Sequence, residues 1–248
     1  MNLAFARAGS LLLILLVWEL LWIQGLPAYV LGPVEILKDF SIALGSKELY
    51  SHIGASLMRS LPGFVIGTLV GTAFGLLAGM ARGFDRMLSP VIFMTYPVPK
   101  IVMLPLFMLW FGIGDFSKIL IIALACFYPM FINAYYGVKA TPTILVWSGL
   151  SMGAGKWRIF LKVVVPSALP LIFAGMRVSL ALSFIVMFAA EMINARSGLG
   201  HLIREAENSL RFDLMYVSLL SIAVLGYAGD RLLRLSRERV LAWQESSA

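Results

Sequence analysis

The sequence contains few of the residues that soluble proteins place on their surfaces. Charged residues make up 13% of the 248 positions, whereas a soluble domain carries about 25%. Two histidines and a single cysteine, Cys126, provide neither a cysteine cluster for a metal nor a pair for an intrachain disulfide. Hydrophobic residues instead reach 60%, with a mean hydropathy of +0.89. These values exclude a soluble enzyme, a disordered protein and a disulfide-stapled secreted module.

Six apolar runs are each long enough to cross a bilayer, which requires about 20 residues per helix. The sequence therefore predicts an all-α membrane protein with about six transmembrane helices, at residues 8–25, 61–80, 87–112, 119–138, 169–192 and 214–233. Two further segments, 33–60 and 200–213, are amphipathic. Each is expected to lie at the outer interface or to pack as a helical lid on the outer face of the bundle. The chain divides accordingly into an N-terminal part, 1–60, and a transmembrane core, 61–243.

The net charge of +7 comes from 20 Lys and Arg against 13 Asp and Glu. An excess of basic residues is also typical of nucleic-acid-binding proteins. Here the basic residues lie in the loops between the spans, and a membrane topology accounts for them better than nucleic-acid binding does. The short cytoplasmic loops of membrane proteins are enriched in Lys and Arg. If the N-terminus is in the cytoplasm, the cytoplasmic loops of this chain contain more Lys and Arg than the outer loops. The sequence therefore predicts a multi-pass protein with both termini in the cytoplasm, surrounded by the lipid bilayer and bound to no nucleic acid.

Glycine recurs at every fourth position of the second predicted span, at residues 63, 67, 71, 75 and 79. Such spacing leaves a smooth groove along one side of a helix, where the backbone of another helix can approach closely. Helix packing is the favoured interpretation. Sliding of one helix against another during a transport cycle is a compatible functional alternative.

Prolines interrupt the third predicted span, at positions 90, 97, 99 and 105. They leave backbone carbonyls unpaired, which lipid cannot satisfy, and interrupted helices near the midplane often mark a substrate path. A kink without function is the alternative. Lys100 falls inside this break. Because a buried ammonium is costly, it is expected to face an aqueous cavity or to pair with a carboxylate.

Two more charged residues lie in the fifth predicted span. Arg177 is expected to pair with Asp230 or to contact an anion, and Glu191 to act as a cap or gate at the outer end. Asp230 and Arg234 form an i,i+4 pair that favours a structural bridge. The sequence contains no acidic series of the kind used for proton relays, which disfavours a proton-coupled carrier. The predicted translocation pathway comprises Pro97, Pro99, Lys100, Pro105, Trp110, Arg177 and Glu191.

Two short motifs suggest chemistry that their surroundings do not support. Residues 149–153 match the G-x-S-x-G pattern of serine hydrolases, but that motif requires a preceding strand and a long apolar helix stands there instead. Both histidines, His52 and His201, are expected on the opposite side of the membrane from the serine. Residues 153–157 resemble a phosphate loop in which Trp157 replaces the required Ser or Thr. No catalytic residue or nucleotide site is therefore assigned, and an intramembrane enzyme is disfavoured.

The segment between the fourth and fifth spans, residues 139–168, carries the apolar side chains of Met152, Trp157 and Phe160 among basic ones. It is predicted to form a helix, a glycine break and a second helix that stops at residues 163–166. One interpretation is a docking surface for a soluble partner, in the helix-in-groove manner. The alternative is an amphipathic helix that lies on the lipid.

This segment resembles the cytoplasmic motif of permease subunits of bacterial ABC importers: Glu-Ala-Ala, three residues, Gly, nine residues and Ile-x-Leu-Pro. Gly153 occupies the glycine position, and Val163, Val165 and Pro166 follow at the required spacing. Residues 147–149 are Trp-Ser-Gly in place of Glu-Ala-Ala, so the usual acidic residue is absent.

Three further motifs, at residues 105–114, 167–177 and 191–200, are similar to the nitrate/sulfonate/taurine branch of that family. The resemblance extends over about residues 10–243 and implies the type I ABC importer permease fold, in a bacterial cytoplasmic (inner) membrane. The expected partners are two cytoplasmic ABC ATPase subunits, a periplasmic or lipid-anchored substrate-binding protein, and a second permease copy in a homodimer. This chain would bind no cofactor, because ATP and Mg²⁺ would be used by the ATPase.

The cargo implied by the resemblance is a small anion such as sulfonate, taurine or nitrate, or a related solute such as a thiamine-pyrimidine precursor. The resemblance also assigns ATPase coupling to a helix in the loop, at Ser151, Met152, Gly153, Ala154, Trp157, Arg158 and Pro166. Gly153 is expected to permit the turn between two short helices, because glycine tolerates a positive φ. A self-sufficient secondary transporter or channel, which needs neither a docking loop nor an ATPase, is the alternative.

Overall fold

The computed structural model describes residues 3–243, and every secondary-structure element in that range is helical. Four stretches are long and apolar enough to cross a membrane: α3 (Lys47–Met80), α6 (Asp115–Lys139), the stretch Lys156–Asn194 that includes α9 (Val165–Asn194), and α11 (Phe212–Val240). A fifth arises if α4 (Arg82–Thr95) and the helical stretch Lys100–Phe111, which contains α5 (Leu104–Phe111), are counted as one span bent by 94°. The predicted all-α membrane fold is confirmed, with four or five spans among the described residues where about six were predicted.

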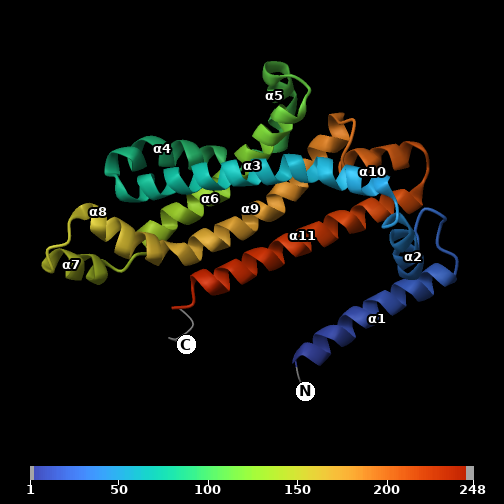
Figure 1. Ribbon diagram of the computed structural model, residues 1–248, viewed down its shortest axis with the longest axis horizontal. Helices are drawn as coiled ribbons and strands as arrows, with labels where there is room; N and C mark the ends of the chain where they lie inside the picture. The colour runs from blue at the N-terminus through green and yellow to red at the C-terminus, as the bar shows by residue number, and fades with distance from the viewer. Residues whose placement is uncertain (1–2, 244–248) are drawn as a thin grey trace.

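The first predicted span corresponds to α1 (Leu3–Ile23), of which Leu12–Ile23 forms a shorter apolar stretch. Figure 1 shows α1 lying apart from the other long helices, with α2 (Pro33–Ala43) between them. The chain ends that were predicted to be cytoplasmic, residues 1–2 and 244–248, lie outside the described residues.

The centre of the bundle is the contact between α3 and α6, which run side by side (Figure 1). A Cβ atom added at Gly71 would lie 2.5 Å from the carbonyl oxygen of Phe127 and 2.7 Å from the Cβ of Met130. The other four glycines of the repeat are equally tight against α6. The packing interpretation of the glycine repeat is therefore confirmed.

Helix α9 covers another side of α6. The Cys126 thiol donates to the carbonyl oxygen of Ser179 at 3.3 Å, and the Ser179 hydroxyl donates back to the carbonyl oxygen of Cys126 at 3.1 Å. This reciprocal pair satisfies two polar side chains in an apolar interior, where an unpaired one would be costly. Fully buried Met187 packs in the same core cluster as Cys126, and fully buried Met130 packs with Ala168 and Ile172 of α9.

The start of the second span differs from the prediction. Helix α3 begins at Lys47 and not at residue 61, and the Ser46 hydroxyl caps it by accepting from the amide of Glu48 at 3.2 Å. Pro62 stands inside α3 without ending it. Buried Leu49 and Ser56 show that this first part of α3 packs into the bundle.

The second amphipathic segment forms α10 (Leu199–Asn208), which packs against α9 and α11. Its buried side chains, Leu199, Leu202, Ile203 and Ala206, lie on one face of the helix. Residues 199–208 therefore pack on the bundle as a helix, as the lid interpretation predicts, and the side of the membrane on which they lie stays a prediction. Helices α2 and α10 lie at one end of the bundle, and α7 (Thr143–Ser151) and α8 (Lys156–Ile159) lie at the other (Figure 1).

We expect Gly71→Ala to destabilise the fold by about 1–3 kcal/mol, because the new methyl group would overlap the backbone of α6. Gly54→Ala is the matched control, since Gly54 lies on the same helix and nothing stands within 4 Å of an added Cβ there. It should be neutral or stabilising by up to about 1 kcal/mol, as alanine favours helix. Thermal unfolding of the purified protein in mild detergent measures both, and equal effects would contradict the close contact.

Candidate coupling and translocation sites

The loop between α6 and α9 projects from one end of the bundle as two short helices, α7 and α8 (Figure 1). The turn between them depends on Gly153, whose φ is +76°. The amide of Gly153 donates to the carbonyl oxygen of Leu150 at 2.9 Å, and the amide of Ala154 donates to that of Gly149 at 3.0 Å. Because side-chain-bearing residues rarely adopt this φ, the role predicted for Gly153 in the turn is confirmed.

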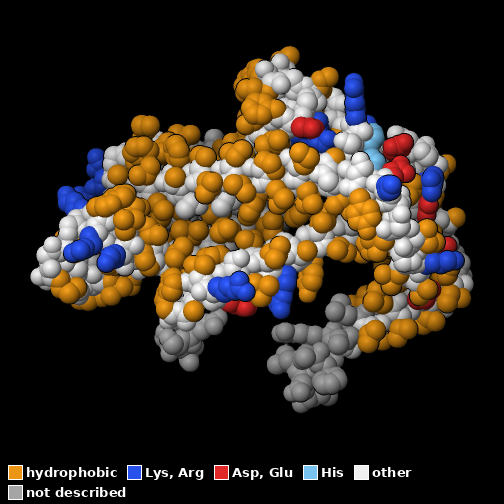
Figure 2. Space-filling model, in the orientation of Figure 1, with side chains coloured by type: hydrophobic (Ala, Val, Ile, Leu, Met, Phe, Trp, Pro, Cys, Tyr) orange, Lys and Arg blue, Asp and Glu red, His pale blue; other side chains and the backbone are white. Residues whose placement is uncertain are grey.

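The loop exposes apolar side chains that a soluble surface would not leave uncovered. Trp147, Met152 and Trp157 are 68%, 81% and 70% exposed. Figure 2 shows hydrophobic side chains over this end of the molecule with lysine and arginine among them. A contiguous apolar surface with a basic border is typical of a protein or membrane contact.

A groove of about 380 Å³ separates α7 from the start of the following helix. Leu145 and Met152 line it on one side, and Val163 and Pro166 on the other. The residues assigned to coupling, Ser151, Met152, Gly153, Ala154, Trp157, Arg158 and Pro166, therefore lie at the end of α7, in the turn, in α8 or beside this groove.

The predicted helix stop at residues 163–166 is wrong. Helix α8 continues through a π-helical turn, Phe160–Val164, directly into α9. Proline lacks an amide hydrogen and its ring crowds the carbonyl four residues earlier. A π turn before Pro166 changes the hydrogen-bond spacing where that conflict would arise. The second half of the loop is thus the end of a spanning helix and will move with it.

The proline-rich break lies between α4 and the 3₁₀ turn Lys100–Met103 that precedes α5. The Lys100 ammonium donates to three carbonyl oxygens, those of Thr95 at 2.6 Å, Val98 at 2.7 Å and Tyr96 at 3.2 Å. It also lies 3.9 Å from the centre of the Tyr128 ring. Of the two alternatives expected for Lys100, the carboxylate partner is not found among the described residues, because the carbonyls freed by the break and the aromatic ring take its place.

The other pathway residues of this region are placed around the same break. Pro97 and Pro99 lie within it, Pro105 stands in the first turn of α5, and Trp110 is 61% exposed near the end of that helix. Figure 1 shows α5 projecting away from the long helices.

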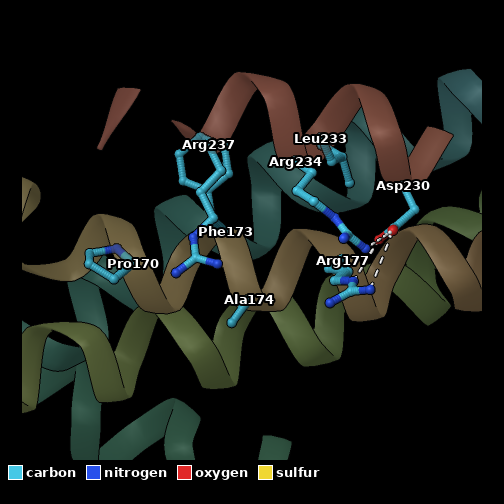
Figure 3. A pocket seen from close by; sticks show the side chains of 8 residues that line it. All are labelled: Pro170, Phe173, Ala174, Arg177, Asp230, Leu233, Arg234 and Arg237. Carbon is cyan, nitrogen blue, oxygen red and sulfur yellow. Dashed lines mark hydrogen bonds and ion pairs between the residues drawn. The ribbon is translucent and has the colours of Figure 1, made fainter. Parts of the chain in front are cut away.

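Arg177 lines a pocket of about 300 Å³ between α9 and α11. Its Nε donates to Oδ1 of Asp230 at 2.5 Å, and Nη2 of Arg234 donates to Oδ2 at 2.8 Å (Figure 3). The predicted pairing of Arg177 with Asp230 and the predicted Asp230–Arg234 bridge are both confirmed. Arg237 is the third guanidinium at this pocket.

Glu191 is fully buried at the α2/α10 end of the bundle. Its Oε1 accepts from Nη1 of Arg59 at 2.6 Å, and its Oε2 accepts from the Ser56 hydroxyl at 2.8 Å and from the amide of Gly200 at 3.0 Å. Arg59 also donates from Nε to Asp115 at 2.7 Å. This network joins α3, α6, α9 and α10.

Sequence reasoning gave Arg59 no role, because it falls in the predicted amphipathic segment 33–60. The available signal was the four-residue period of the glycine repeat, since Arg59 stands four residues before Gly63 and continues the same helix face. Glu191 and Arg177 are 14 residues apart on α9, about 21 Å along its axis. The predicted pathway residues therefore do not form one cluster.

The structure also separates the residues of the hydrolase-like motif. The rings of His52 and His201 stack 6.1 Å apart on α3 and α10. Ser151 ends α7 at the opposite end of the bundle (Figure 1). Ser151 therefore has neither histidine beside it.

Comparison with known proteins gives one family. Residues 67–242 match the binding-protein-dependent transport system inner membrane components. The chain is 37% identical to the aliphatic sulfonates transport permease protein SsuC of Escherichia coli over 86% of this chain and 81% of that protein. It is 31% identical to the taurine transport system permease protein TauC of the same species, over 95% and 88%. It is 34% identical to the riboflavin transport system permease protein RibX of Chloroflexus aurantiacus, over 96% and 89%.

The fold is similar to that of a chain in inward-facing structures of the MetNI methionine ABC transporter. The TM-score is 0.63, with 75% of this chain and 95% of that chain covered, at 20% sequence identity. At this identity the likeness concerns the fold, and it supports the type I permease architecture.

We expect Glu191→Gln to cost about 3–5 kcal/mol, because it leaves the buried Arg59 guanidinium without its buried counter-charge. Asp115→Asn is the matched control, as Asp115 contacts the same guanidinium but its side chain is 64% exposed. Exposed ion pairs contribute at most about 1 kcal/mol. Unfolding of both variants in mild detergent gives the comparison, and a larger loss for Asp115→Asn would refute the central position of Glu191.

Proposed function

This chain belongs to the family of binding-protein-dependent transport system inner membrane components, and we propose that it carries a small organic anion, of the sulfonate class, into the cell. It is the permease subunit of an ABC transporter. The chain supplies the path through the membrane, and no catalytic group is assigned to it.

The observation that carries the coupling proposal is the continuity of the exposed loop with a spanning helix. Trp157 and Arg158 lie on α8, which runs without a stop into α9. A partner that grips this surface can therefore turn or tilt α9 directly. The groove beside Met152 and Pro166 offers a site for an apolar side chain of that partner.

We propose that the gripping partners are two cytoplasmic ABC ATPase subunits, which hold ATP and Mg²⁺ themselves. A second copy of this chain would complete the membrane path as a homodimer, and a periplasmic or lipid-anchored binding protein would deliver the cargo. ATP binding would then shift the population between two arrangements of the spans. Loop residues 147–149 lack the acidic group of the family motif, so docking here relies on apolar contact and on the basic Lys156 and Arg158.

The proposed cargo follows from the names of the relatives and from the charges in the spans. Sulfonate and taurine carry a sulfonate group, an anion that basic side chains bind through charge-assisted hydrogen bonds. The riboflavin relative shows that the family also includes permeases for larger organic solutes, and a pyrimidine-type solute is the second candidate. Uptake of radiolabelled taurine, ethanesulfonate and riboflavin by cells that express the whole transporter separates these classes.

The remaining pathway proposal concerns the break around Lys100. Irregular backbone at membrane depth is tolerated where it is buried in protein or lines a water-filled cavity. The loop that contains Pro97 and Pro99 fits this description, and Pro105 and Trp110 would continue the path along α5. We propose that the α7/α8 end faces the cytoplasm of an inner membrane, consistent with its basic residues.

Substitution of Gly153 by Asp should abolish uptake while leaving expression intact. The left-handed φ of +76° disfavours any side chain, and a carboxylate would be added to the docking surface. Gly83→Asp is the matched control, because it adds the same charge near the start of α4, where an Asp is favourable and nothing lies within 4 Å. Normal uptake by Gly153→Asp would contradict the coupling assignment.

Affinity purification of the tagged chain from its native membranes tests the ATPase proposal. A co-purifying ATPase in stoichiometric amount supports it, and that ATPase should be lost with Gly153→Asp and kept with Gly83→Asp. If the chain is recovered alone and uptake persists when every candidate ATPase is deleted, the secondary transporter or channel is the correct alternative.

A further inference from the structure

The pocket between α9 and α11 carries more positive charge than its own carboxylate can balance. Three guanidinium groups line it, those of Arg177, Arg234 and Arg237, with Asp230 as the only acidic residue of the lining. Asp230 accepts from Arg177 and Arg234. Figure 3 shows the Arg237 side chain reaching from α11 toward α9. Two positive charges therefore remain at this pocket, available to an anionic ligand.

The remaining lining residues are apolar: Pro170, Phe173, Ala174 and Leu233. A small hydrophilic anion would make no favourable contact with these apolar side chains. An amphiphile whose anionic group meets the guanidiniums and whose hydrocarbon follows the apolar side chains would use both parts of the pocket.

The position of the pocket along α11 matches the level of lipid head groups. The apolar run of α11 ends at Leu233, and Arg234 and Arg237 follow within about 6 Å along the helix axis. Tyr227 and Leu232 are 72% and 66% exposed on the same helix, as expected for a surface that meets lipid. In the proposed orientation this is the cytoplasmic leaflet, where basic pockets between helices bind anionic head groups.

We propose that this pocket binds the phosphate of an anionic phospholipid of the cytoplasmic leaflet, held by Arg237 and Arg234 of α11 and by Arg177 of α9. The bound lipid joins α9 to α11. Because α9 continues into α8, occupancy of the pocket stabilises one position of the coupling loop relative to α11. The site uses the orientation given under the proposed function but neither its cargo nor its ATPase.

A small free anion shares this chemistry, since a sulfonate on its way through the protein could meet the same guanidiniums. Such a free anion would correspond to the pathway role predicted for Arg177, and it is the alternative to a lipid at this pocket. The two sources differ in their need for hydrocarbon, and the experiment below separates them.

The test uses the whole transporter, purified in mild detergent, stripped of lipid and titrated with phosphatidylglycerol or phosphatidylcholine while bound lipid is counted by native mass spectrometry. Arg237→Gln is the test variant, because the structure gives its guanidinium no ion pair among the described residues and the Arg177–Asp230–Arg234 bridge is kept. Arg239→Gln is the matched control, with the same charge change, on the same helix and outside the pocket lining.

We expect the wild-type protein to prefer phosphatidylglycerol, and Arg237→Gln to weaken that binding at least fivefold while Arg239→Gln changes it less than twofold. If both variants lose phosphatidylglycerol binding equally, the binding comes from general attraction to a basic helix, and the proposed site is refuted. Equal binding of the two lipids by the wild type would also overturn it.

Ethanesulfonate added in large excess distinguishes the rival source. We expect phosphatidylglycerol to stay bound, and its displacement by this free anion would assign the pocket to a soluble ligand instead. Recovery of the ATPase with each variant is recorded in the same preparations. Loss of lipid preference with the ATPase retained would refute the lipid site alone, whereas a missing ATPase in the wild type would refute the coupling proposal alone.

Discussion

The close approach of α3 to α6 is the constraint on which the other sites depend. Glycine at five consecutive four-residue steps lets the two backbones lie almost in contact from residue 63 to residue 79. At one end the same face of α3 continues as Arg59, which can therefore reach Asp115 at the start of α6 and Glu191 on α9. Near the other end of α6, Lys139 pairs with Asp85 of α4 at 3.1 Å. A charged contact thus ties each end of α6 to a neighbouring helix, α3 at one end and α4 at the other, while the middle of the α3–α6 interface contains no polar bridge between the two helices among the described residues.

The break near Lys100 shows how a membrane protein can interrupt a helix without leaving polar groups unsatisfied. Residues 97 and 99 are prolines, so two amides are missing and several carbonyls lose their helical partners. The prolines in the sequence predict that carbonyl groups lose their helical partners, but not which groups bind those carbonyls instead. A single lysine returns to three of those carbonyls and rests on Tyr128. The ammonium needs no carboxylate because its charge is shared among oriented dipoles and an aromatic face.

Periodicity and length were sufficient to predict most of the spans, the glycine contact and the turn at Gly153, because each depends on residues close in sequence. The continuity of α8 with α9 was not predictable in this way. Valines and a proline at residues 163–166 predict a stop, and only the packed structure shows that a π turn accommodates the proline. Arg59 was missed for a related reason. Its partners Glu191 and Asp115 are more than 50 residues away, and a charge at the edge of an apolar run gives no sign of whether it faces water or the interior.

Helix α9 takes part in three of the sites described, the coupling loop, the Arg177 pocket and the Glu191 network, and their order along it suggests how motion would pass. Glu191, near its far end, is held by a buried network that joins four helices, so this end is the fixed point. The loop end carries exposed α8 and is free to be gripped. Arg177 lies between them and is tied to α11 by partly exposed ion pairs, which cost little to break and to remake. A force applied at α8 would therefore be resisted most strongly at Glu191 and least at Arg177. The contact between α9 and α11 is then where the two arrangements of an importer would differ most, and where a bound anion would have its greatest effect on the balance between them.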